Sequence, residues 1–379
     1  MKNPMKIVHV IEPLAGGMVT FLTSLVENLP EHTHLIVHGN REHVTPLAEV
    51  KKQFTSPNVK FIRWASAQRS LHLKKDAKAF FELYTILKKL KRKRLLDVVH
   101  LHCSKGGFLG RMVCRVLGLQ HLVIYTPNGA PFMAGSNPVS NYLYKILEKT
   151  ASLFGGQVVC CSPSEQQAYN KVGIKAITIN NGIPYKKLIG RRVTRNKGNH
   201  NNNNFTVVTS GRIVDQKDPE LFNTIALFFE DFPDFEFLWV GDGDAKEKLT
   251  AKNIRVTGWL PAEKANELVA ASDVYISTAK YEGLPFAVLE ALAMNMPVLL
   301  TDCVGNKDLI NNLNGAVFSD GHEAKYRLLQ FYNNASMLNL MGQHSGSYCK
   351  KHFNLADTFR RYQYLYQQAC FMPELSYTS

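Results

Sequence analysis

The strongest constraint on the fold is a repeated alternation between short apolar runs and longer stretches of helical periodicity. In the first half of the chain, short runs rich in β-branched residues lie at 6–11, 34–38, 59–64, 98–102, 122–126, 157–161 and 176–179. A second series lies at 205–210, 235–240, 254–257, 274–277 and 298–301. Strands that alternate with helices predict parallel sheets, so we expect an α/β protein of two doubly wound, Rossmann-like domains.

A polar segment at 186–204 separates the two series. It contains Arg191, Arg192 and the tract Asn199-His200-Asn201-Asn202-Asn203-Asn204. Such a segment has too few apolar side chains for a core and is typical of a linker. We therefore predict a first domain at 1–185, a linker at 186–204, a second domain at 205–360, and a C-terminal helix at 361–379 placed to pack back on the first domain.

Composition limits the class of protein. The 379 residues suffice for two cores of ordinary size. Hydrophobic residues make up 45% and no run of about 18 apolar residues spans a bilayer. Residues 1–13 lack the features of a secretory signal, so we expect a cytoplasmic protein. The seven cysteines lack metal-ligand spacing and are expected to be reduced thiols.

The net charge of +14 is unevenly distributed. Residues 1–190 contain 26 Lys and Arg against 10 Asp and Glu, whereas residues 191–379 contain 19 against 21. The first domain is therefore strongly basic and the second is close to neutral. The basic residues are not interleaved with aromatic residues on strands and no nucleic-acid-binding motif is present, so we expect no nucleic acid partner.

The densest basic run lies at the end of a predicted helix and comprises Lys88, Lys89, Lys91, Arg92, Lys93 and Arg94. Apolar residues precede it at helical spacing: Leu73, Ala77, Phe80, Phe81, Tyr84 and Leu87. The pattern fits two interpretations. The helix lies on anionic lipid, where each basic residue contributes about 1 kcal/mol, or it packs Phe80 and Phe81 into the core and leaves a solvated basic end.

Two carboxylates follow the run at 274–277. Glu282 lies in the loop ahead of a helix that has Pro285 in its first turn, and Glu290 lies in the second turn of that helix. The N-terminus of a helix is suited to a diphosphate, while carboxylates accept hydrogen bonds from sugar and ribose hydroxyls. The alternative is one carboxylate that stabilises its own helix and one exposed glutamate, since two glutamates at this spacing often occur by chance.

Two cations follow the run at 205–210. Arg212 offers a planar fork of donors and Lys217 a compact charge, so together they can neutralise a departing diphosphate. The alternative is that Arg212 forms a surface ion pair with Asp215 or Asp218.

The segments Glu282-Gly283-Leu284-Pro285-Phe286, Glu290-Ala291-Leu292-Ala293 and Met296-Pro297-Val298 together resemble the signature of the family-four retaining glycosyltransferases, which have the GT-B fold of two domains facing across a cleft. The resemblance implies that Glu282 contacts the transferred sugar and Glu290 the donor ribose. It also implies that Arg212 and Lys217 bind the diphosphate.

The resemblance extends less sharply to further loops. It places the loops of Gly241 and Gly258 beside the nucleotide base, and the Gly16-Gly17 loop beside a phosphate. It also makes Lys105, which follows the run at 98–102, a candidate for binding acceptor or lipid phosphate. Plain turn chemistry explains the same loops equally well.

One position departs from the family pattern. The family commonly has Thr-Pro-His-Gly after the fifth run, whereas this chain has Thr126-Pro127-Asn128-Gly129. Asparagine can hydrogen-bond sugar hydroxyls but cannot carry a proton near neutral pH. We therefore interpret Asn128 as a positioning group, and the departing phosphate as the acceptor of the proton.

These observations predict a retaining, metal-independent transferase that uses a nucleotide sugar without a cofactor, and the resemblance implies that the nucleotide is uridine-linked. We expect a lipid-linked glycan as acceptor and peripheral binding to the inner leaflet of the cytoplasmic membrane. Asp242-Gly243-Asp244 has the spacing of a metal-binding pair, but its turn context favours the base-side loop. Alternatives are an epimerase or glycan phosphorylase of the same fold, or a non-catalytic partner subunit, which Asn128 favours.

Overall fold

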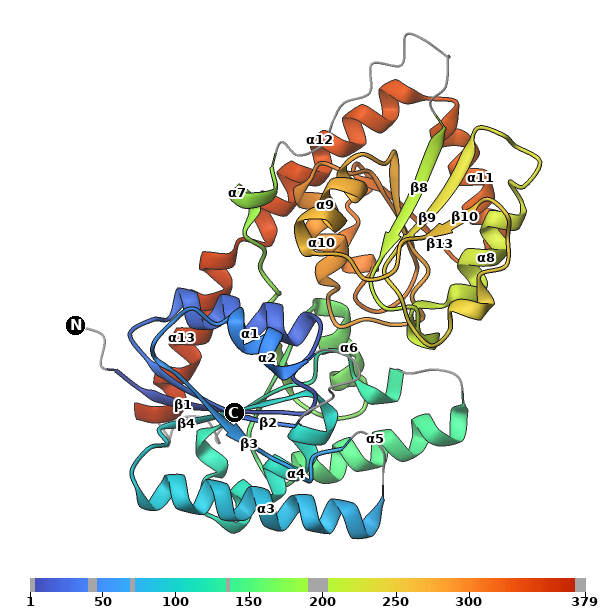
Figure 1. Cartoon of the computed structure of the whole chain (residues 1–379). Coiled ribbons are helices and arrows are strands. Elements are labelled where there is room, and N and C mark those ends of the chain that lie inside the picture. Colours follow the sequence, from blue (N-terminus) through green and yellow to red (C-terminus); the bar gives the residue numbers. More distant parts are fainter. Residues whose placement is uncertain (1–3, 40–45, 69–71, 134–136, 190–203, 372–379) are drawn as a thin grey trace. The chain divides into compact units, whose positions relative to one another are not determined.

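The computed structural model describes residues 4–39, 46–68, 72–133, 137–189 and 204–371. The chain forms two compact units. Unit 1 comprises Met1–Asn181 and Ala356–Ser379, and unit 2 comprises Gly182–Leu355. Of the predicted linker at 186–204, residues 190–203 lie outside the described residues. The chain returns to unit 1 through its last helix, drawn in red in Figure 1.

Unit 1 is built on a seven-stranded parallel sheet in the order β3-β2-β1-β4-β5-β6-β7. Its strands are β1 (Lys6–Ile11), β2 (Thr33–His38), β3 (Val59–Arg63), β4 (Val98–His102), β5 (Val123–Thr126), β6 (Gln157–Cys160) and β7 (Ala176–Thr178). Its helices are α1 (Gly17–Asn28), α2 (Leu47–Lys52), α3 (Leu73–Arg92), α4 (Cys103–Val116), α5 (Pro138–Ser152), α6 (Pro163–Lys171) and α13 (Leu355–Phe371).

Unit 2 has a six-stranded parallel sheet in the order β10-β9-β8-β11-β12-β13. Its strands are β8 (Phe205–Ser210), β9 (Phe235–Val240), β10 (Ile254–Val256), β11 (Val274–Ser277), β12 (Val298–Thr301) and β13 (Gly315–Phe318). Its helices are α7 (Tyr185–Leu188), α8 (Pro219–Leu227), α9 (Ala262–Ala270), α10 (Phe286–Ala293), α11 (Gly321–Tyr332) and α12 (Ala335–His352).

The predicted α/β fold of two doubly wound sheets is confirmed. Every predicted run is a strand whose ends lie within one residue of the prediction. The prediction missed β13, because this strand is short, begins at a glycine and follows an Asn-rich turn at 311–314. In each unit the order of strands reverses beside the first strand, which is where open α/β sheets bind ligands.

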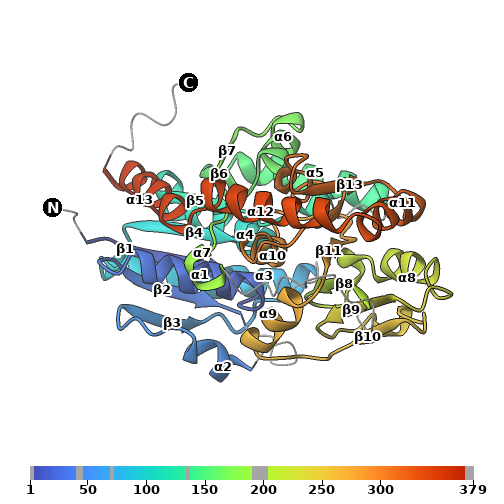
Figure 2. The same cartoon turned by 90° about the horizontal axis from the view of Figure 1, so that it is seen from above.

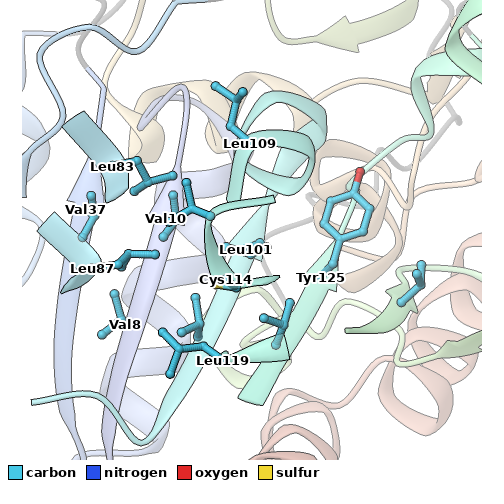
Figure 3. Close-up of a cluster of buried hydrophobic side chains, with 14 of the residues drawn as sticks. Val8, Val10, Val37, Leu83, Leu87, Leu101, Leu109, Cys114, Leu119 and Tyr125 are labelled. Carbon is cyan, nitrogen blue, oxygen red and sulfur yellow. The ribbon is translucent and has the colours of Figure 1, made fainter. Parts of the chain in front are cut away.

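The two faces of the unit 1 sheet differ in chemistry. One face is apolar: Val8, Val10, Val37 and Leu101 pack under α3 and α4 and are fully buried (Figure 3). Because successive side chains of a strand point to opposite faces, the residues between them face α1 and α13. That second face carries four buried histidines, His9, His34, His100 and His102.

Helix α13 completes the second face. Tyr366 Oη lies 2.7 Å from His100 Nδ1, and the Tyr362 ring packs edge-on against Phe21 of α1. Gln363 Nε2 donates to Glu31 at 3.0 Å. The last helix of the chain therefore contributes to the core of unit 1.

The core of unit 2 is aromatic and aliphatic. Rings from β8, α8, the turn after α8 and β9 pack together, including Phe205, Phe222, Phe229, Phe237 and Trp239. Helix α10 buries most of its surface and packs against α12 (Figure 2). Helix α10, which follows the Glu282 loop, is therefore held in place by its buried side chains.

Helix α3 corrects the predicted register of the apolar stripe. The buried residues are Ala79, Leu83, Leu87 and Leu90, whereas Leu73 is 92% and Phe81 65% exposed. Of the predicted stripe, Leu87 is buried and Phe80 and Tyr84 are partly buried against the core. In the sequence, the adjacent Phe80 and Phe81 did not show which side of the helix is buried. The helix does pack on the core, and its basic end is exposed.

Candidate active site

Four loops at the carboxyl edge of the unit 2 sheet form the candidate donor site, and three of them carry predicted site residues. They follow β8, β9, β11 and β12, and β9-β8-β11-β12 are neighbours in the sheet. The carboxyl ends of parallel strands lie at one edge, so side chains from distant parts of the sequence meet there.

The structure joins Lys217 and Glu282 directly. Lys217 ends the short 3-10 helix after β8 (Asp215–Lys217), and its Nζ lies 2.7 Å from Glu282 Oε1. The Lys217 side chain is 22% and the Glu282 side chain 11% exposed. Burial by itself would lower the pKa of Lys217, but the Glu282 carboxylate outweighs it and the pKa is raised. The site therefore keeps a protonated lysine at neutral pH.

Hydrogen bonds fix the loops of Lys217 and Glu282 against each other. Thr278 Oγ1 donates to the Lys217 carbonyl at 2.6 Å, and the Lys280 amide donates to the Gln216 carbonyl at 2.9 Å. Gln216 Nε2 donates to the Tyr281 carbonyl at 3.1 Å. Gln216 and Thr278 were not singled out in the sequence, although both lie within the motif loops.

The loop after β12 holds the backbone of Glu282 in place. The sequence analysis did not single out this loop. The Glu282 amide donates to the Val304 carbonyl at 3.0 Å. Gly305 has φ 87°, and a Cβ there would lie 2.7 Å from the Glu282 carbonyl oxygen. Asn306 Nδ2 donates to Thr301 Oγ1 at 2.9 Å. The one sequence signal for this close approach is a glycine in the loop, four residues after the end of β12.

Glu290 lies in the second turn of α10, as predicted, and differs from Glu282 in its surroundings. No hydrogen bond or ion pair involves its carboxyl group within the described residues. Burial raises its pKa to about 7. Pro285 is the N-cap, so the helix begins one residue later than expected, at Phe286. Its first amides are available to an anion.

Arg212 is exposed on the same loop as Lys217. The acidic neighbours suggested as its partners have other cations: Asp215 pairs with Lys248 at 2.7 Å, and Asp218 lies 3.7 Å from Lys280. Arg212 also opposes the protonation of Lys217 slightly, as expected for two nearby cations.

The Gly241 and Gly258 loops follow β9 and β10. Gly241 has φ 147°, and a Cβ there would collide with the Gly211 carbonyl oxygen. Its amide donates to Thr257 Oγ1 at 3.2 Å, which ties it to the Gly258 loop. The glycine at 241 is therefore required by the close approach of two loops.

In unit 1, Gly16 is the N-cap of α1 and Gly17 its first residue. A Cβ at Gly16 would meet no atom within 4 Å, so the backbone there borders open space. The binding of a phosphate at the N-terminus of α1 stays a prediction.

The side chains of Asn128 and Lys105 both bond to other residues of unit 1. Asn128 has φ 56°, its Nδ2 donates to the Thr126 carbonyl at 3.1 Å, and its Oδ1 lies 3.2 Å from Cys161 Sγ. Lys105, in the first turn of α4, has an 8% exposed side chain whose Nζ lies 2.7 Å from Asp76 Oδ1. The basic residues Lys88, Lys89, Lys91, Arg92, Lys93 and Arg94 are all exposed.

Three histidines in unit 1 lie close enough together to be candidate ligands of one metal ion. The ligand atoms of His9, His100 and His102 lie within 4.8 Å of one another among the described residues. Hydrogen bonds already account for this spacing. His34 Nε2 lies 3.1 Å from the Leu29 carbonyl, His34 Nδ1 3.1 Å from His9 Nε2, and His9 Nδ1 3.2 Å from His102 Nε2.

A carbonyl only accepts, so His34 carries its hydrogen on Nε2, and the chain assigns Nε2–H to His9 and His102 in turn. Burial lowers the pKa of His34 to about 4 and of His102 to about 3. The histidines are therefore neutral structural groups at physiological pH.

The comparisons with known proteins agree with this geometry. Residues 15–187 match the model "Glycosyltransferase Family 4", and residues 204–334 match "Glycosyl transferases group 1". The predicted family and fold are confirmed: the chain belongs to the family-four glycosyltransferases and has the GT-B fold.

One curated relative is the Escherichia coli UDP-Gal:alpha-D-GlcNAc-diphosphoundecaprenol alpha-1,3-galactosyltransferase. It is 29% identical over 267 residues, which cover 64% of this chain and 66% of that protein. A sucrose-phosphate synthase from Thermosynechococcus elongatus has a similar structure, with a TM-score of 0.77 and 17% identity over 96% of this chain and 98% of that chain. Anabaena HepE in complex with UDP and glucose has a TM-score of 0.74 and 15% identity, covering 95% and 99%.

Proposed function

We propose that this glycosyltransferase is a retaining hexosyltransferase that moves a sugar from a UDP-linked donor to a hydroxyl group of a lipid-linked glycan in surface polysaccharide synthesis. The observation that carries the proposal is the Lys217–Glu282 ion pair beside the N-terminus of α10, with the Glu290 carboxyl nearby on the same helix. The names of the similar proteins, with their UDP-sugar donor, diphosphoundecaprenol acceptor and bound UDP, support it.

The donor would bind unit 2 through complementary groups. Lysine has three N–H donors, so Lys217 can keep Glu282 and still donate to a phosphate oxygen. Arg212 and the first amides of α10 supply further donors for the diphosphate. The Glu290 carboxylate accepts hydrogen bonds from the two ribose hydroxyl groups, and the Gly241 and Gly258 loops border the base.

The reaction follows from where charge develops. The bond between the anomeric carbon and the diphosphate oxygen breaks, and Lys217 and Arg212 stabilise the negative charge on the leaving group. The acceptor hydroxyl attacks from the same face, so the configuration is retained, and its proton passes to the departing phosphate. Glu282 accepts hydrogen bonds from the transferred sugar. These cations supply the positive charge, so we propose transfer without a metal or cofactor.

Asn128 has a positioning role in this proposal. Its left-handed backbone conformation is one that asparagine tolerates well, and its side chain holds the 126–129 turn against Cys161. The proton of the acceptor does not need a base at this position, because the leaving phosphate takes it.

The acceptor would bind the basic unit 1. A diphosphate-linked lipid carries negative charge and lies in a membrane, and the exposed basic run of α3 suits both. Within the described residues no helix is long and apolar enough to cross a bilayer. We therefore propose peripheral binding at the cytoplasmic face of the membrane.

The test is a panel of UDP- and GDP-sugars with the purified protein, with and without a polyprenyl-diphosphate-linked sugar. Release of nucleoside diphosphate that requires the acceptor is expected, and nuclear magnetic resonance of the product reports whether the anomeric configuration is retained. Glu290→Ala should abolish release, whereas Glu267→Ala, an exposed helical glutamate of unit 2, should not.

Three outcomes would contradict the proposal in different ways. Conversion of the donor without an acceptor hydroxyl would indicate an epimerase. Sugar phosphate formation from a glycan and phosphate would indicate a phosphorylase. Donor binding without turnover across the panel would indicate a non-catalytic partner subunit.

A further inference from the structure

Helix α5 presents an apolar face that its own unit leaves uncovered. Exposure is 76% at Val139, 66% at Tyr142, 48% at Leu143, 43% at Ile146 and 78% at Leu153. At helical spacing these positions fall on one side of the helix. The sequence analysis did not single out this segment, and none of these residues belongs to the donor site.

The opposite side of α5 is firmly fixed, so its outward direction is set by the fold. Glu148 is buried, with one oxygen 2.8 Å from Arg111 Nη2 and the other accepting from Tyr125 Oη at 2.9 Å. Ala151 is fully buried, and Tyr144 packs on the unit 1 core. Turning the helix to hide its apolar face would expose this buried ion pair, which is strongly unfavourable.

Both exposed charged residues of helix α5 are positive. Lys145 and Lys149 are exposed on α5, and Glu148, the acidic residue of this helix, is buried. A Cβ at Gly173 would lie 3.9 Å from Lys149 Nζ, so the turn between the exposed Lys171 and Lys175 borders the same face. The surface is therefore apolar with a basic margin.

Helix α3 adds to this surface. Helices α3, α4 and α5 cover the same side of the unit 1 sheet (Figure 1), and α4 packs against both of the others. Facing away from its buried stripe, α3 exposes Phe81 together with Lys78, Lys88 and Arg92. Two helices of one layer thus combine exposed apolar side chains with basic ones.

We infer that the outer face of α5, together with the basic face of α3 in the same helical layer, is a docking surface for a bilayer that contains anionic phospholipid. The inference rests on the proposed function, which brings the enzyme to a lipid-linked acceptor, and it identifies the part of the fold that contacts the membrane. Apolar side chains enter the interfacial region while lysines contact phosphate headgroups.

Charge favours a bilayer over a second copy of the chain. Two copies meeting through this face would bring together two strongly basic surfaces, which repel each other. Lysine is also depleted in protein interfaces relative to other surfaces. An anionic bilayer instead attracts each lysine.

The test measures flotation of the full chain with vesicles of phosphatidylcholine, alone or mixed with phosphatidylglycerol. Three double variants are compared: Val139→Gln with Tyr142→Gln, Lys145→Glu with Lys149→Glu, and, as a matched control, Tyr326→Gln with Leu340→Gln on the exposed helices of unit 2. We expect binding that requires phosphatidylglycerol and falls about tenfold in each α5 variant, with no change in the control.

Equal flotation of wild type and α5 variants would overturn the inference, and so would a loss of self-association in those variants without a change in vesicle binding. Transfer to a short-chain, water-soluble acceptor is measured in parallel and should be unchanged by the α5 substitutions. Absence of that transfer in the wild type would count against the proposed function alone, because flotation is read without turnover.

Discussion

Unit 2 and unit 1 use their strand-end loops in different ways. In unit 2 the loops bring charged groups together where they remain reachable: Lys217 meets Glu282, and Arg212 is exposed beside them. In unit 1 the corresponding polar groups are used internally, since Lys105 pairs with Asp76 and Asn128 contacts Cys161 and its own turn. The comparison shows that charged groups meet at the strand ends of unit 2, whereas the corresponding groups of unit 1 are paired within the unit.

The cores of the two units differ as well. One side of the unit 1 sheet is lined with neutral histidines, whereas the unit 2 core is aromatic and aliphatic. Buried groups that can take up protons make stability depend on pH. The two units should therefore respond differently to acid as well as to substitution.

The largest expected effect is on the ion pair of unit 2. In the proposed mechanism Lys217→Ala removes a cation that stabilises the leaving group, and we expect kcat to fall about 1000-fold. The double variant Lys217→Ala with Glu282→Gln should be little worse than Lys217→Ala alone, because paired groups act as a unit. Single-turnover transfer measures both, with Lys246→Ala, an exposed lysine of the same unit, as control. Additive losses would mean that the two residues act separately.

The second effect is a loss of stability at acid pH that is expected in unit 1 and not in unit 2. The pKa values of His34 and His102 are lowered from 6.5 to about 4 and about 3. Below pH 6.5 the unfolded chain binds more protons than the folded one, so unit 1 loses stability as pH falls. The loss is on the order of 3 kcal/mol for His34 and 5 kcal/mol for His102 once pH is below the folded pKa of each.

Urea unfolding followed by hydrogen exchange at pH 7 and pH 5 should show this loss in unit 1 strands. His102→Phe should reduce the pH dependence of unit 1 and leave that of unit 2 unchanged. If both units weakened equally on acidification, the histidine face would not be the cause.

The third effect concerns Glu290, whose pKa is raised from 4.5 to about 7 by burial. Folding holds a proton on this carboxyl, so its contribution to the stability of unit 2 falls as pH rises from 4.5 to 7, opposite to the histidines. Donor binding should depend on pH in the opposite direction and improve as pH rises, because the ionised carboxylate is the better hydrogen-bond acceptor. The KM for donor should rise about tenfold from pH 8 to pH 6.

Glu290→Gln should remove this pH dependence of KM and make unit 2 more stable at pH 8. Steady-state kinetics and thermal unfolding over the same pH range measure the two effects. A KM that varies with pH in the same way in the variant would assign the titration to another group.

The smallest effect is expected at Asn128. Histidine tolerates the left-handed conformation nearly as well as asparagine, so Asn128→His should leave kcat within about threefold if the leaving phosphate takes the proton. Asn128→Val serves as a contrast, because a β-branched residue is strained at φ 56°. A large gain in kcat for Asn128→His would show that a base is useful there.

The sequence determined the local periodicity and the family. Short continuous apolar runs between helical stretches predicted the strands to within one residue, because the strands of a parallel sheet are buried on both faces. The motifs around Glu282 and Glu290 identified the family, because a helix start with fixed glycine and proline positions is specific. β13 was missed, since a four-residue run that begins at a glycine carries little of this signal.

Only the tertiary structure decided which groups meet. The pairing of Lys217 with Glu282, the support of Glu282 by Gly305, and the stacking of His9 with His102 join residues from separate strand ends. The buried stripe of α3 and the uncovered face of α5 were likewise set by packing. A helical sequence shows that it has faces, but which face is buried depends on the free energy of packing against neighbours that the local pattern does not contain.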